Sequence, residues 1–219
     1  MNKKAVIIGN GKSINDHIER GDFDLLQHAD NVETFAMNQI HRIYDRVSWR
    51  PDNWFMMESE NWKRAWKDAV KYHFCEESNE QPYIAITHRE VVQYYFDTAV
   101  APKYLCRCQH FITNNEVWHL PVVCRYGGTI SIALQTAYQL GFREVAVIGC
   151  DLGIKAGGGD HFDEDYVTVL EPRETFEMKN EILINAHTNA RQYLNIFNCG
   201  IGGELEVHPR MELEEFINV

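Results

Sequence analysis

The fold is decided by the stretch Lys4-Ala5-Val6-Ile7-Ile8-Gly9-Asn10-Gly11-Lys12-Ser13. Its first half is a short β-branched apolar run, which is typical of a parallel strand buried on both faces. The two glycines that follow allow a sharp turn and a close approach of the backbone to a ligand. The segment lacks the third glycine of a dinucleotide fingerprint and the four-residue spacer of a Walker A loop. It predicts a nucleotide- or phosphate-binding loop at residues 9–13 without specifying the ligand.

The composition is that of an ordinary globular protein. The chain has 219 residues, 45% hydrophobic and 24% charged, which fits one nucleotide-binding α/β domain over residues 1–219. Its net charge of −11 disfavours binding to a nucleic-acid polymer. The apolar run after Lys4 is too short for a signal peptide or a membrane span. We therefore expect a cytoplasmic protein without an integral membrane segment. The formation of a homo-oligomer is an open alternative.

The cysteines indicate reduced thiols. The six cysteines include no C-x-x-C pair. Several of them gather with histidines, but the C-x-C-x-H spacing is not that of a common structural zinc site. Buried thiols are the favoured interpretation, and no metal ligands are predicted for this group. The group consists of Cys106, Cys108, His110, His119 and Cys124.

Apolar runs alternate with helical periodicity along the chain. This pattern predicts an α/β fold with a Rossmann-like, mostly parallel sheet flanked by helices. Residues 87–124 are the least regular and are predicted to form a lid or an insertion. The predicted strands are 4–8, 32–37, 54–57, 83–86, 144–149 and 195–198, and the predicted helices are 61–72, 129–140 and about 174–194.

Two glycine loops lie where strands meet helices. Besides residues 9–13, Gly127-Gly128-Thr129 opens a helix that Thr129 is expected to cap. Both loops offer backbone N–H groups, which suit a phosphate and a sugar. Asp151 follows a strand and is expected at the carboxyl edge of the sheet, where such folds bind ligands. The alternative is that the glycines only make tight strand-to-helix turns.

Four blocks, in order, carry a resemblance to a known family. They are Val6 to Ser13, Phe35 to Gln39, Gly128 through Val145, and Ile148 to Asp151. Together they resemble the bacterial sialyltransferases of glycosyltransferase family 42. They also resemble the related archaeal hydroxymethylpterin pyrophosphokinase-like and flagellin-glycosylation accessory proteins. The tail, Ile196 through Leu205, is more similar to the pyrophosphokinase-type branch.

The resemblance implies a nucleotide at the carboxyl edge of the sheet, which in the sialyltransferases is part of a cytidine monophosphate (CMP) sugar. Asn10 and Asn38 match asparagines that bind the nucleotide there, and Thr129 matches a hydroxyl residue that does so. An asparagine amide both donates and accepts, which suits ribose hydroxyls and a base edge, although it also stabilises turns locally. The predicted nucleotide-binding residues are Gly9, Asn10, Gly11, Ser13, Asn38, Gly128, Thr129 and Asp151.

The candidates for the catalytic base are histidines. The sialyltransferases use a histidine to deprotonate the acceptor hydroxyl, with tyrosines near the leaving phosphate, and no histidine here aligns with that base. His161, beside a glycine-rich loop, is the first candidate, and His187, in the late helix, is the second. An imidazole with an ordinary pKa near 6.5 is available as a base at neutral pH. Tyr166 is the candidate for assisting the leaving phosphate.

The leading prediction is a sialyltransferase-like glycosyltransferase. It would move a sugar from a nucleotide-activated, CMP-linked donor to a hydroxyl of a glycan or small-molecule acceptor, without a required cofactor. One alternative is a Mg²⁺-dependent pyrophosphokinase that uses ATP on a small alcohol such as a pterin. Its metal would bind the carboxylates of Asp151, Asp160 and residues 163–165, which otherwise form a solvated acidic loop. The other alternative is a non-catalytic nucleotide-binding protein.

Overall fold

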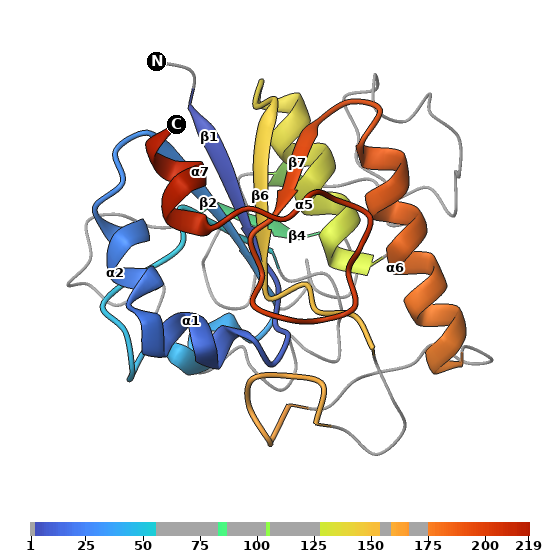
Figure 1. The fold of residues 1–219 in the computed structure, drawn as a ribbon, viewed down its shortest axis with the longest axis horizontal. Coiled ribbons are helices and arrows are strands. Elements are labelled where there is room, and N and C mark those ends of the chain that lie inside the picture. The colour runs from blue at the N-terminus through green and yellow to red at the C-terminus, as the bar shows by residue number, and fades with distance from the viewer. Residues whose placement is uncertain (1–2, 56–82, 87–103, 106–127, 154–158, 167–174) are drawn as a thin grey trace.

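The computed structural model describes residues 3–55, 83–86, 104–105, 128–153, 159–166 and 175–219. The predicted helix 61–72, the cysteine and histidine group at 106–124, and the possible lid at 87–124, except residues 104–105, lie outside them. Figure 1 shows the described part as a sheet between helices, with both ends of the chain at the same end of the molecule.

A seven-stranded sheet forms the centre, with the order β5-β4-β3-β2-β1-β6-β7. Every pair of neighbouring strands is parallel. This confirms the predicted α/β, Rossmann-like fold. The order reverses between β1 and β6, and ligands of such sheets bind at the carboxyl ends of the strands near this point. The strands are β1 (Lys4–Ile8), β2 (Val32–Met37), β3 (Asn53–Phe55), β4 (Tyr83–Ile86), β5 (Tyr104–Leu105), β6 (Glu144–Ile148) and β7 (Asn195–Asn198).

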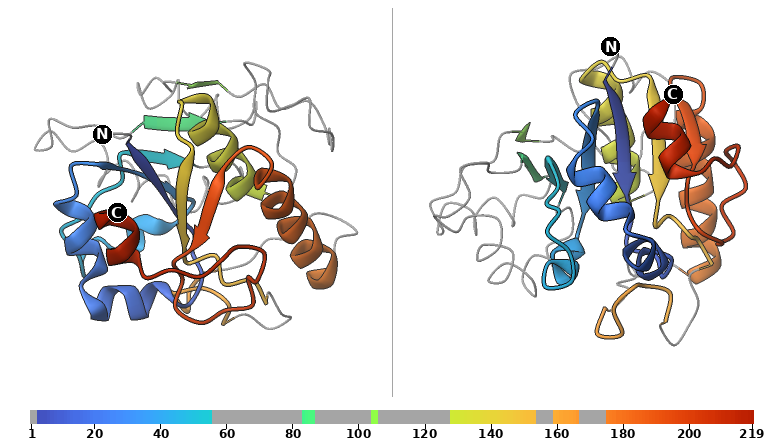
Figure 2. Two further views of the ribbon diagram at one scale, coloured as in Figure 1. Left: turned by 45° about the horizontal axis from the view of Figure 1, so that its top comes forward. Right: turned by 60° about the vertical axis from the view of Figure 1, so that its left-hand side comes forward.

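Helices cover both faces of the sheet (Figures 1 and 2). Successive residues of β1 point to opposite faces, so Val6 and Ile8 enter one core cluster and Ile7 the other. The first cluster lies under α1 (Ile14–Arg20), α2 (Asp22–Gln27), the 3₁₀ helix η1 (Ile40–Ile43) and α7 (Leu213–Asn218). The second lies under α5 (Gly128–Gln139) and α6 (Phe176–Ala190). Burial on both faces explains the unbroken apolar run of β1.

Two predicted details of α5 are wrong. The helix begins at Gly128, so Thr129 lies in its first turn and is not the cap. Leu140, the last residue of the predicted helix 129–140, follows the observed helix and is 42% exposed. Gly141 explains the second difference, because its φ of +96° turns the chain away from the helix.

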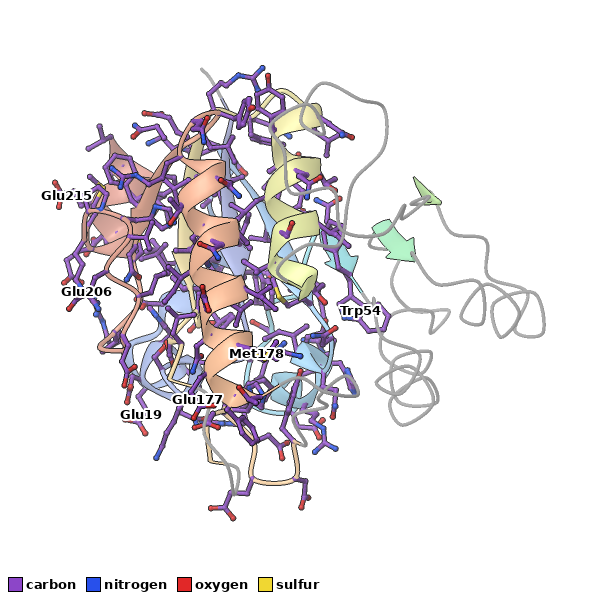
Figure 3. The ribbon with its side chains drawn as sticks, turned by 90° about the vertical axis from the view of Figure 1, so that its right-hand side faces the viewer. Glu19, Trp54, Glu177, Met178, Glu206 and Glu215 are labelled. Carbon is purple, nitrogen blue, oxygen red and sulfur yellow. The ribbon has the colours of Figure 1, made fainter. Side chains whose placement is uncertain are left out.

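Several acidic side chains lie on the outer surface. Figure 3 shows Glu19, Glu206 and Glu215 at the periphery of the molecule, and all three are exposed. Asp22 differs, because it is only 7% exposed and pairs with the buried His17. Among the described helices, none combines the length and the apolar character needed to cross a membrane.

Candidate functional site

The loops that follow β1 and β6 touch each other through glycines. The backbone N–H of Gly9 donates to Ile148 O (2.8 Å), and that of Gly11 donates to Gly149 O (2.7 Å). A Cβ atom added at Gly9 would lie 2.2 Å from Gly149 O, far inside van der Waals contact. The glycine pair that decided the fold is therefore required for the packing of two loops at the point where the strand order reverses.

Asp151 contacts the start of α1. Its carboxylate accepts hydrogen bonds from the backbone N–H of Ser13 (2.7 Å) and from Ser13 Oγ (2.5 Å). A helix start has unpaired N–H groups and a partial positive charge, which dinucleotide-binding folds use for a phosphate. Here a carboxylate of the protein itself occupies that position. The predicted residues Gly11, Ser13 and Asp151 thus meet, but in a contact within the protein.

A second group joins the ends of β1 and β2 to the start of α5. Asn10 donates from Nδ2 to Met37 O (3.0 Å), and Thr129 Oγ1 lies 3.4 Å from Asn38 Oδ1. The indole N–H of Trp54, labelled in Figure 3, donates to Asn38 O (2.9 Å). Asn38 has a φ of +49°, a left-handed conformation that asparagine adopts more readily than most residues. The structure therefore brings the three predicted polar ligands Asn10, Asn38 and Thr129 to one end of the sheet.

Asn10 has an acceptor that the protein leaves unused. The residue is only 6% exposed, and its Oδ1 has no hydrogen-bond partner among the described residues. A buried carbonyl oxygen without a donor costs about 1–3 kcal/mol, so such groups usually have a partner in the working state. Because Nδ2 is fixed on Met37 O, Oδ1 is the remaining polar atom of this side chain, and an amide oxygen accepts from a hydroxyl or an amine.

The segment 159–166 carries His161 and Tyr166 onto the β1 loop. His161 pairs with Gly11 in an antiparallel bridge, and its Nδ1 lies 3.0 Å from Asn10 O. The His161 and Tyr166 rings have centroids 3.8 Å apart. Figure 1 and the right view of Figure 2 both show this segment, in orange, at the same end of the molecule as the start of α1. Both predicted catalytic residues therefore adjoin the asparagine and glycine residues of the loop.

The hydrogen bond to Asn10 defines the tautomer of His161. A carbonyl oxygen can only accept, so Nδ1 carries the proton and Nε2 carries the lone pair in the neutral ring. Burial lowers the pKa of His161, and this outweighs the hydrogen bond to Asn10 and the charge of Asp160, which raise it. The ring is consequently neutral at physiological pH, which is the state a general base requires.

His187 lies in a different part of the fold. It belongs to the last turn of α6, which leads to the amino-terminal end of β7, whereas His161 lies at the carboxyl ends of the strands. Its Nδ1 is 2.9 Å from Nε2 of His208, and both rings are buried. Burial lowers the pKa of His187 to about 3. The structure does not bring the second candidate base together with the first.

Two of the carboxylates considered for Mg²⁺ bind protein groups. Asp151 binds Ser13, as described above. Asp163 Oδ2 accepts from Arg42 (2.9 Å), and Asp163 Oδ1 accepts from the N–H of Asp165 (2.8 Å). Within the described ranges, no group of three or more histidine, cysteine, aspartate or glutamate residues is arranged to hold a metal ion. Cys150 adds no nucleophile, because burial raises the pKa of its thiol to about 12.

The structure was compared with known proteins. No protein-family model and no curated protein matches the sequence. A solved structure described as MAf glycosyltransferase from Magnetospirillum magneticum AMB-1 is similar, with a TM-score of 0.61 and 18% sequence identity. The chain has a glycosyltransferase-like fold. The match covers 98% of this chain but 34% of that protein, so the chain spans about a third of its length. At this identity the likeness shows the fold and not the activity.

Sequence reasoning missed three residues that support this site. Asn15 donates from Nδ2 to Phe162 O (2.9 Å), and Phe162, only 7% exposed, anchors the segment 159–166 in the core. Arg42 binds Asp163 across the same interface. The signal available in the sequence was Phe162 itself, since an isolated aromatic residue in a charged loop is often an anchor.

Proposed function

We propose that this chain transfers a sugar from a nucleotide-activated donor, CMP-linked, to a hydroxyl of a glycan or small-molecule acceptor. The buried Oδ1 of Asn10, which no described residue uses, carries the proposal, because the main-chain carbonyl of the same residue holds a neutral histidine at the carboxyl end of the central strand. The glycosyltransferase-like fold supports the reaction class, and the sequence resemblance supports the cytidine nucleotide.

The proposed mechanism is a direct displacement. Asn10, Asn38 and Thr129 hold the nucleotide through amide and hydroxyl groups. Nε2 of His161 removes the proton of the acceptor hydroxyl as its oxygen attacks the anomeric carbon and the bond to the nucleotide phosphate breaks. Tyr166 and the N–H groups at the start of α5 stabilise the departing phosphate. His161 is preferred over His187 as the base, since His187 is 1% exposed and cannot meet an acceptor.

This mechanism requires no metal ion. The Mg²⁺-dependent pyrophosphokinase is the alternative, and the nucleotide-binding experiment below distinguishes the two functions. It would need Asp151 and Asp163 to exchange their protein partners for a cation. A non-catalytic nucleotide-binding protein would show nucleotide binding and no turnover.

Nucleotide binding is tested by thermal unfolding with CMP, UMP and ATP, each with and without Mg²⁺. A ligand at 100 times its dissociation constant stabilises the folded state by about 2.7 kcal/mol. We expect a metal-independent response to CMP that is lost in Asn10→Ala. Asn31→Ala is the matched control, because Asn31 also donates from Nδ2 to a backbone carbonyl (2.9 Å) but precedes β2. A response to ATP that requires Mg²⁺ would favour the pyrophosphokinase, and no response to any nucleotide would exclude the proposed pocket.

Turnover is tested by release of CMP from CMP-sialic acid in the presence of a hydroxyl acceptor. His161→Asn is expected to keep the thermal response to CMP while it lowers the rate by about 10²–10⁴-fold, the range of general base catalysis. A His161→Asn protein that turns over at the wild-type rate would remove His161 from the mechanism.

A further inference from the structure

Asp163 organises the turn that carries the proposed catalytic pair. Its Oδ1 accepts from the N–H of Asp165 (2.8 Å), and its carbonyl accepts from the N–H of Tyr166 (3.1 Å). Its Oδ2 accepts from Arg42 NH1 (2.9 Å). One side chain therefore shapes the turn and also attaches it to another part of the fold.

Arg42 supplies that attachment from η1. Its Nε donates to Oε1 of Gln39 (2.8 Å) while NH1 donates to Asp163. Gln39 is 2% exposed and directly follows Asn38, a proposed nucleotide ligand. A guanidinium that binds two groups through a rigid planar fork fixes their relative positions better than a flexible ammonium does. Arg42 thus connects the loop after β2 to the turn of residues 163–166.

The contacts of the segment divide at His161. At the next residue, the Phe162 N–H donates to Asn10 O (3.2 Å) and Asn15 donates to Phe162 O (2.9 Å). These bonds fix the main chain. The ring of His161 is held on its other side by Tyr166, whose position depends on the turn that Asp163 shapes. The Arg42–Asp163 pair is the described ion pair that acts on this part of the segment.

We propose that Arg42 is a positioning residue, which acts through Asp163 and Tyr166 to hold the His161 ring with Nδ1 on the Asn10 carbonyl. The orientation of the ring stands on geometry alone, and its catalytic meaning rests on the proposed function. Among the described residues, the charged groups that act on His161 are Asp160, Asp151 and Lys179. None of them belongs to the Arg42–Asp163 pair, so substitutions in the pair leave these groups in place.

The direct test is the tautomer of His161, read from ¹⁵N chemical shifts of the imidazole at pH 8, where the ring is neutral. Protonated and unprotonated ring nitrogens have well-separated shifts, and a His161→Gln spectrum assigns the signal. We expect wild type to show one form with the proton on Nδ1. Arg42→Gln and Asp163→Asn are expected to show a mixture of both tautomers, and Arg42→Lys to return most of the wild-type form.

The matched control is Arg20→Gln, which breaks the exposed Arg20–Glu212 pair (2.6 Å) at the end of α1. It should leave the His161 signal unchanged. Far-UV circular dichroism checks that each variant is folded. If Arg42→Gln does not fold, Asp163→Asn provides the test in its place. An unchanged tautomer in both variants would overturn the proposal, and so would an equal shift in Arg20→Gln.

Turnover gives a second readout that separates this proposal from the proposed function. A misplacement of a catalytic group by about 1 Å costs about 10²-fold in rate, so Arg42→Gln should lower kcat by about 10- to 100-fold. Asp163→Asn should lower kcat likewise while KM for the CMP-linked donor stays within about twofold, because this variant leaves the Arg42–Gln39 bond beside Asn38 in place. A rise in KM at unchanged kcat would overturn the positioning role. If wild type has no turnover, the proposed function fails while the tautomer measurement still decides the position of the ring.

Discussion

Acidification is expected to destabilise the protein through the buried pair His187 and His208. Burial lowers the pKa of His187 to about 3 and that of His208 to about 4, against about 6.5 in an unfolded chain. As the pH falls below about 6.5, the two histidines therefore bind protons in the unfolded state but stay unprotonated in the folded state. The stability from the neutral pair is fully present above pH 6.5 and is lost as the pH falls. Each histidine changes the free energy of unfolding by about 1.4 kcal/mol per pH unit once its unfolded form is protonated.

From pH 6.5 to pH 5 the pair should remove about 3 kcal/mol from the free energy of unfolding. Urea unfolding followed by circular dichroism at closely spaced pH values measures this slope. The variant His187→Gln/His208→Gln should lose most of it, whatever its stability at pH 7. His28→Gln, at an exposed position, should keep it. A double variant with the wild-type slope would refute the argument that these two rings are buried and neutral.

Two further predictions concern the loops at the carboxyl ends. Gly9→Ala should lower the free energy of unfolding by about 3 kcal/mol or more, because its Cβ would lie 2.2 Å from the carbonyl oxygen of Gly149. Gly21→Ala, with a φ of +80° but open space around its Cβ, should lose about 1 kcal/mol, and equal losses in urea unfolding would contradict the reasoning. Ser13→Ala should lower the free energy of unfolding by about 1 kcal/mol and Asp151→Ala by about 2–3 kcal/mol. The second loss is larger because only Asp151→Ala leaves the Ser13 N–H without its acceptor. A larger loss in Ser13→Ala than in Asp151→Ala would contradict this argument.

Six of the seven strands could be predicted because their signals are local, whereas β5 (Tyr104–Leu105), within the predicted lid or insertion, is too short to carry a pattern. Ala5 to Ile8 in β1 and Val145 to Ile148 in β6 are fully buried, and unbroken apolar runs are typical of strands covered on both faces. The face of α5 that repeats at Ile130, Ala133 and Ala137 follows the helical period and is buried as expected. By contrast, α1, α2 and α7 have only seven, six and six residues. Such lengths are too short to show a period, so these helices were not predicted.

The contacts within the site could not be predicted, because they join distant parts of the chain. Ser13 and Asp151 are 138 residues apart, and Asn10 and His161 are 151 residues apart. The rule for parallel sheets places each of them at the carboxyl edge but does not say which side chains pair there. The burial of His187 likewise depends on His208, which follows it by 21 residues and comes from another segment. A histidine on a helix has the same sequence pattern whether it faces solvent or a second histidine.

The carboxylate of Asp151 changes where a phosphate can bind in the proposed reaction. A negative charge at the start of α1 repels a phosphate there, so the donor phosphate has to use the start of α5, where Thr129 and Asn38 meet. The side chain of Asn10 reaches toward β2, while its main-chain carbonyl holds His161. The nucleotide and the base therefore contact different sides of one residue. A direct displacement needs this separation, because the attacking oxygen and the leaving phosphate lie on opposite sides of the reacting carbon.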